Sequence, residues 1–268
     1  MDISALQFVL AILAGIAAGV INTLAGSGSA VTLPMLVYLL SGTGIENVAG
    51  VANATNRVGV LVQNIAGIAT YQRNKKLDIG GSFWLTVPAM LGAVVGTYIA
   101  TILSNDQMEF AIGVMMVIIL ITIFVNPNKW LRQQSEVKAG RPSLGVLALF
   151  FVIGAYGGFV QAGVGVFILS AMVLGAGYSM THANGIKLVI VLALTVVALV
   201  VFIFSPVEIN WGIGALMAVG QSIGAWAAAK FAVSVPNANK YVRWLLIVVV
   251  IYSIFKFFGI LDLLLGML

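Results

Sequence analysis

The sequence predicts an all-α polytopic membrane protein with two inverted-topology repeats, each a broken or re-entrant helical hairpin followed by three transmembrane helices. Hydrophobic residues make up 61% of the 268 residues and charged residues only 8%, far below the roughly 25% charged share of soluble domains. The apolar stretches are continuous, whereas a transmembrane barrel has short alternating ones. They also fall into two similar sets of five.

Polar breaks separate ten predicted segments. They are 5–24, 30–40, 48–70, 80–103 and 107–125 in the first set, and 144–160, 164–175, 183–204, 211–229 and 241–260 in the second. The second member of each set has about a dozen residues, too few to cross about 30 Å of hydrocarbon. We therefore expect the first two segments of each set to form a hairpin, within repeats at residues 1–126 and 143–268.

Matching residues in the two sets support an internal repeat. The matched stretches are 15–22 with 154–161, 25–28 with 162–165, 52–54 with 183–185, and Gly92 and Gly96 with Gly220 and Gly224. Small residues at such spacings are common wherever membrane helices pack closely, so each match is weak alone. Their shared order along the chain is the stronger evidence.

Basic residues predict which side of the membrane each loop faces. Basic residues follow the third segment of the first half but not that of the second, and the next pair of loops reverses this pattern. Matching loops should therefore lie on opposite sides, which defines an inverted repeat. The basic linker at 127–142 is expected to be cytoplasmic and both termini external. The basic residues of the matching loops are Arg73, Lys75 and Lys76 in the first half and Lys230, Lys240 and Arg243 in the second.

Arg57 and Lys187 are cationic residues inside apolar segments that contain no Asp or Glu. An ionisable group at membrane depth costs about 2.5 kcal/mol or more, so it is usually paired or functional. We expect the missing negative charge to belong to a small anionic substrate. Arg57 can offer a bidentate fork to an oxyanion; alternatively, it bonds helix-end carbonyls or is drawn toward Glu46. Lys187 lies about one turn inside its segment and could instead extend to the interface.

The two glycine-rich hairpin tips are the strongest candidate site. Their site residues are Gly26, Ser27, Gly28 and Ser29 in the first half and Gln161, Gly163 and Gly165 in the second. Glycine allows a sharp turn, and the half-helix after each tip presents N–H groups that suit an anion. The alternative is that these glycines only allow helices to cross. Amides that could complete the lining, or bond neighbouring helices, are Asn22, Asn53, Asn56, Gln63, Asn64 and Asn184.

His182, the only histidine, could sense or relay a proton, although a lone histidine at the mouth of a helix is more often an interfacial or capping residue. No cluster of His, Cys and carboxylates suits a metal, and no nucleophile with a His or Asp partner lies in the apolar segments. We therefore expect no metal, no cofactor, no catalytic residue and no enzymatic activity. The basic residues lie in short connections, so the expected surroundings are a lipid bilayer and not nucleic acid.

At these glycine-rich segments the sequence resembles the TauE/SafE family of sulfite and organosulfonate exporters, which are bacterial integral membrane proteins. The resemblance rests on residues 15–34, 154–170, 52–57 and 183–187 and covers nearly the whole chain. It implies a multi-pass transporter of the bacterial cytoplasmic (inner) membrane that moves sulfite, sulfoacetate or similar anions outward. The first tip departs from the family, which often has a run of adjacent glycines where this chain has Gly26-Ser27-Gly28-Ser29.

The leading hypothesis from the sequence is a secondary transporter that exports a small sulfur oxyanion by alternating access between two halves. The membrane potential could drive an anion outward, because the cell interior is negative. Two alternatives stay open. One is a passive anion channel that uses the same cations, and the other is a non-transporting scaffold or accessory subunit whose buried charges dock an acidic partner helix. The fold also leaves room for a homodimer.

Overall fold

The computed structural model describes residues 5–73, 83–124, 142–175, 178, 180–234 and 238–260. Within these residues the chain forms α-helices and one π-helical turn, which confirms the predicted all-α class. The helices are α1 (Ala5–Ala25), α2 (Ser29–Leu40), α3 (Val48–Arg73), α4 (Phe83–Ile102), α5 (Asn105–Phe124), α6 (Leu144–Phe159), α7 (Val164–Ser170), η3 (Ala171–Gly175), α8 (Met180–Ile203), α9 (Trp211–Ser234) and α10 (Ala238–Phe257). The predicted segment ends agree with these bounds to within five residues, with α7 and η3 together forming the seventh segment.

The outer surface of the helices suits a lipid environment. Four described stretches are long and apolar enough to cross a membrane, namely Ala5–Thr23, Phe83–Ile102, Asn105–Thr122 and Gly185–Ile203. Large apolar side chains such as Leu91, Val200 and Trp226 are exposed on the outside. Because burial in lipid is the favourable state for such a surface, the chain is a polytopic helical membrane protein.

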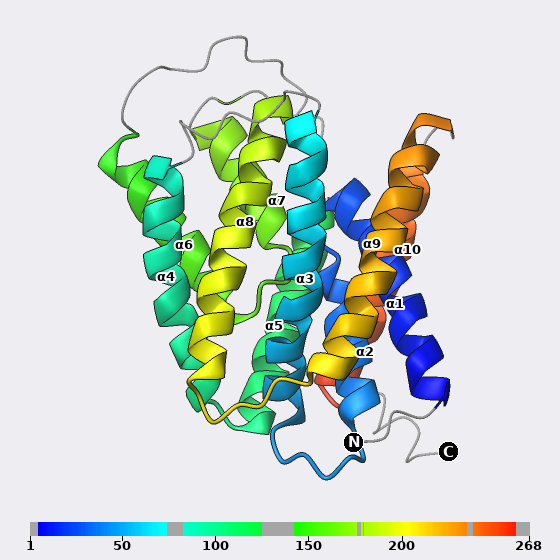
Figure 1. The fold of residues 1–268 in the computed structure, drawn as a ribbon. Helices are drawn as coiled ribbons and strands as arrows, with labels where there is room; N and C mark the ends of the chain where they lie inside the picture. Colours follow the sequence, from blue (N-terminus) through cyan, green and yellow to red (C-terminus); the bar gives the residue numbers. More distant parts are fainter. Residues whose placement is uncertain are drawn as a thin grey trace.

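The first two helices of each half form a broken hairpin. In Figure 1, α2 returns toward the lower end of the molecule, where α1 begins and α3 starts, whereas α7 rises toward the upper end, where α8 starts. The two hairpins thus open toward opposite ends, and their tips turn back inside the helical body. The inverted topology relative to a membrane stays a prediction, because residues 127–141 of the basic linker and the loop at 74–82 lie outside the described residues.

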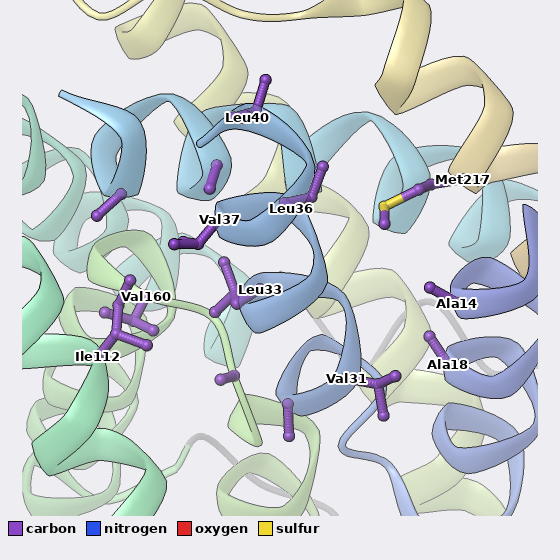
Figure 2. Packing of buried hydrophobic residues seen from close by; sticks show 14 of the residues in the cluster. Ala14, Ala18, Val31, Leu33, Leu36, Val37, Leu40, Ile112, Val160 and Met217 are labelled. Atoms are coloured by element: carbon purple, nitrogen blue, oxygen red, sulfur yellow. The ribbon is translucent and has the colours of Figure 1, made fainter. Parts of the chain in front are cut away.

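Helix α2 is enclosed by protein over most of its surface, and Tyr38 is its one exposed residue. Ten of its 12 residues are buried, and Figure 2 shows Leu33, Leu36 and Val37 pointing outward from it toward neighbouring elements. Those neighbours include Ala14 and Ala18 of α1, Ile112 of α5, Val160 after α6 and Met217 of α9. A helix that is apolar all round is a buried core element. The core therefore fixes the position of the first hairpin tip, where α2 begins.

Glycines allow the first helix of each hairpin to pack closely against a helix of the other half. Helix α1 contacts α9, and α6 contacts α4. A Cβ atom on Gly15 would lie 2.6 Å from the carbonyl oxygen of Met217, and one on Gly154 would collide with the carbonyl oxygen of Ala89. This is the close backbone approach that small residues permit in membranes. The two pairings correspond when α1–α5 are matched in order with α6–α10, as an internal repeat would require.

Candidate functional site

The two hairpin tips meet beside a small polar cavity between α3, α8 and α9. The carbonyl oxygen of Gly26 in the first tip lies 3.1 Å from the position that a Cβ on Gly165 of the second tip would occupy. The space available to the centres of water molecules is about 30 Å³, room for roughly two waters. The lining consists of Asn22, Gly26, Gly28, Ser29, Val60, Gln63, Asn64, Gln161, Gly163, Val164, Gly165, Lys187, Leu188, Val191 and Gln221.

The backbone at both tips adopts the left-handed conformation. Gly26 has φ of +74° and Gly163 has φ of +72°, a region that glycine enters without steric cost. Gln161 also has a positive φ, of 66°, which is uncommon for a residue with a Cβ. Gly28 is required for a different reason: a Cβ there would lie 2.6 Å from the carbonyl oxygen of Ala18. The tips are therefore shaped by close approach as well as by turning.

Lys187 brings positive charge to the cavity. It extends from α8 past the second tip, where a Cβ on Gly165 would lie 3.4 Å from its Cδ. Among the described lining residues it is the one charged side chain, and none of them is Asp or Glu. A cavity with this composition favours an anion, because the ammonium group carries a positive charge and can only donate hydrogen bonds.

Arg57 lies outside the cavity lining and is fully buried. Its guanidinium donates from Nη1 to the carbonyl oxygen of Gly157 at 2.7 Å and from Nη2 to that of Gly158 at 2.8 Å, at the end of α6. The ring of Phe202 lies below it, with 5.9 Å between the guanidinium carbon and the ring centroid. Positive charge is favourable at a helix C-terminus. The structure thus shows the helix-end carbonyl bonds that the sequence left as an alternative, and contact between Arg57 and a substrate stays a prediction.

Two predicted asparagines of α3 also form hydrogen bonds with the hairpins, outside the cavity lining. Asn53 donates from Nδ2 to the carbonyl oxygen of Phe159 at 2.7 Å, and its Oδ1 accepts from Arg57. Asn56 donates from Nδ2 to Ser29 Oγ at 3.1 Å and accepts from the hydroxyl of Thr32, so it holds the start of α2. Both residues position the tips and do not face the cavity.

The remaining predicted residues divide into three groups. Asn22, Gly26, Gly28, Ser29, Gln63, Asn64, Gln161, Gly163, Gly165 and Lys187 are brought together in the lining. Ser27 is buried but not part of it. The side chains of His182 and Asn184 lie outside what the structure describes, so their predicted roles stay predictions.

Gln221 of α9 is a lining residue that the sequence reasoning missed. Its side chain is 2% exposed and lies against Gly59, where a Cβ would collide with Nε2. It stands between Gly220 and Gly224, which were interpreted only as packing residues. A glutamine inside an apolar segment was the available signal, because a polar residue at membrane depth usually bonds another helix or lines a cavity.

Several backbone N–H groups at the tips have partners within the chain. Those of Ala30 and Val31 donate to the carbonyl oxygens of Ser27 and Gly28, and that of Val166 donates to Gly163. The N–H of Gly28 faces Asn22 Oδ1 at 3.4 Å. The predicted contact between an anion and the N–H groups at the start of each half-helix stays a prediction.

The fold and the cavity define a polytopic helical membrane protein with a small polar cavity beside two hairpin tips. The family model described as "Sulfite exporter TauE/SafE" matches residues 11–257, and the chain belongs to this family. This confirms the resemblance found at the glycine-rich segments.

The chain is also similar to proteins named as membrane transporters. "Probable membrane transporter protein ORF9" of Sinorhizobium sp is 27% identical over 87% of this chain and 85% of its own length. "Probable membrane transporter protein YunE" of Bacillus subtilis is 21% identical over 86% of this chain and 89% of its own, and "Probable membrane transporter protein YfcA" of Escherichia coli K12 is 22% identical over 87% and 82%. No solved structure matches the chain. Family and relatives together make the protein a membrane transporter.

Proposed function

We propose that this protein is a secondary transporter that exports a small sulfur oxyanion, such as sulfite or an organosulfonate, across the bacterial cytoplasmic membrane by alternating access. The observation that carries the proposal is the cavity beside the two hairpin tips, in which Lys187 is the one charged residue among the described lining. The positive charge of this lysine attracts an anion to the cavity. The family description supports a sulfur oxyanion among the anions of suitable size.

The surrounding side chains orient the anion, and the hairpins move around it. Amide groups of Asn22, Asn64 and Gln221 line the same cavity as Lys187 and can donate to oxyanion oxygens. Arg57 acts as a positioning residue, since its bonds to Gly157 and Gly158 hold the end of α6 directly before the second tip. Movement of one broken hairpin against the other would open the cavity to alternate sides.

The test is charge displacement in proteoliposomes to which sulfite, sulfoacetate, isethionate, taurine and carboxylate analogues are applied. We expect a signal selective for sulfur oxyanions that Lys187→Gln removes. Lys256→Gln is the matched control, because it removes the same charge from the last turn of α10, outside the described lining. Equal signals in the wild type and Lys187→Gln would refute the proposal.

The same preparation separates a carrier from the two alternatives. A carrier saturates with substrate and is accelerated by substrate on the opposite side, whereas a passive channel shows no such trans-stimulation. A scaffold would give no anion flux alone and would co-purify with a stoichiometric partner.

A further inference from the structure

We infer that the cavity selects anions that also carry a hydrogen-bond donor, and that Gln161 accepts the hydrogen bond from this donor. This inference rests on the proposed function and narrows its substrate class. The preferred ligands are sulfonates with a hydroxyl group, or singly protonated oxyanions. Anions without an O–H or N–H group are the disfavoured class.

The orientation of the Gln161 amide follows from its partner. Gln161 Nε2 donates to Thr195 Oγ1 at 2.6 Å, and Thr195 Oγ1 lies 2.7 Å from the carbonyl oxygen of Val191. A threonine hydroxyl has one hydrogen, and the Val191 carbonyl can only accept it. The hydroxyl oxygen must therefore accept from the NH₂ group of Gln161, which identifies the other amide atom, Oε1, as the carbonyl oxygen.

That carbonyl oxygen is a buried acceptor without a donor. Gln161 is 2% exposed and lines the cavity, and its Oε1 has no hydrogen-bond partner among the described residues. Nearly all buried polar atoms in native proteins are hydrogen-bonded, so an exception in a cavity lining indicates a partner that is present only part of the time. A bound ligand with an O–H or N–H group is such a partner.

Two other lining residues offer hydrogen-bond donors, in contrast to the acceptor of Gln161. Lys187 can only donate, and Gln221, also 2% exposed, has an Nε2 donor without a partner among the described residues. A ligand that suits the cavity therefore carries a negative charge near Lys187, accepts a hydrogen bond from Gln221 and donates one to Gln161. Because the space for water centres is only about 30 Å³, the anionic group and the donor must belong to one compact molecule.

Isethionate and ethanesulfonate test this selectivity, because they share a sulfonate and a two-carbon chain and differ by one hydroxyl group. The measurement is the apparent KM for charge displacement in proteoliposomes. We expect the wild type to have a KM for isethionate at least about fivefold lower than for ethanesulfonate, the lower bound expected when a buried acceptor is left unsatisfied.

Two substitutions to methionine assign the effect to one residue. Gln161→Met removes the acceptor and should bring the two KM values to within about twofold of each other. Gln221→Met is the matched control from the same cavity: it removes a donor, so it should raise both KM values and keep their ratio. If Gln161→Met does not fold, Thr195→Val replaces it, since loss of the Thr195 anchor lets the Gln161 amide turn and should reduce the ratio.

Equal KM values for the two sulfonates in the wild type would overturn the inference and leave the proposed function intact, because both anions would still be transported. A wild-type preference that survives Gln161→Met and Thr195→Val would also overturn the assignment to Gln161. Absence of charge displacement by either sulfonate would instead count against the proposed function, on which the inference rests.

Discussion

Replacement of Arg57 with methionine should destabilise the folded protein. Arg57 is fully buried and makes two short, charged hydrogen bonds, of 2.7 Å to the carbonyl of Gly157 and 2.8 Å to that of Gly158. Hydrogen bonds to charged groups contribute about 1.5–3 kcal/mol each, which gives about 3–6 kcal/mol for the pair. Removal of the buried charge also removes its desolvation penalty, so we expect a loss near the lower limit, about 3 kcal/mol.

The assay is thermal unfolding of the purified protein in detergent, followed by intrinsic tryptophan fluorescence. A loss of about 3 kcal/mol corresponds to a decrease of roughly 6–12 °C in Tm for a chain of this size. Thr97→Val is the control, since the Thr97 hydroxyl donates to the same Gly158 carbonyl at 3.0 Å as a neutral hydrogen bond. It should lower the free energy of unfolding by only about 1 kcal/mol.

An unchanged Tm for Arg57→Met, together with a raised KM for sulfur oxyanions, would refute this reasoning. That result would mean that the carbonyls at the end of α6 do not need the guanidinium, and it would return Arg57 to the role of a substrate ligand. A lower Tm with an unchanged KM in the folded fraction would support the structural role.

Three further predictions concern packing, orientation and driving force. Gly154→Ala should lower the free energy of unfolding by about 1–3 kcal/mol, because its Cβ would collide with the backbone of Ala89. Gly145→Ala in the same helix is the control, since its Cβ would meet only Ser143 Oγ at 4.0 Å and should not destabilise the protein. Chemical denaturation in detergent compares the two variants. A tag fused after Leu268 should be labelled from outside intact cells, and protection from an impermeant reagent would contradict the predicted topology. An interior-negative potential of 100 mV should drive a monovalent anion outward to about a 50-fold concentration gradient. The gradient is measured in proteoliposomes with an imposed potassium potential. Transport by an electroneutral exchanger would not depend on the potential.

The helices could be predicted from the sequence because each depends on a local property. A continuous apolar stretch that ends at polar residues, as in α4 (Phe83–Ile102), specifies a helix that buries its side chains in lipid or protein. The shortness of α2 and α7 was equally visible, since length alone shows that a segment cannot cross a bilayer. These features need no knowledge of neighbouring elements.

The candidate site was predictable only in part. The glycines and Lys187 carry local signals, a sharp turn and a charge in an apolar segment, and the structure brings them together. The side chains of Arg57 and Lys187 look alike by that criterion, yet one bonds the end of α6 and the other lines the cavity. Which of the two faces a ligand depends on the helices packed around each, and the sequence of α3 or α8 does not contain that information.

The sequence by itself thus determined the class, the order and limits of the helices, the two hairpins and the family. Tertiary structure alone decided which polar groups share a cavity and which form hydrogen bonds that position the hairpins. The physical reason is the range of the interactions: hydrophobicity and turn formation act between near neighbours in the chain, whereas the bonds of Arg57 to Gly157 and Gly158 join residues about 100 positions apart. Likewise, Gln221 and Gln161 become parts of one site only when α9 packs against α1 and α3.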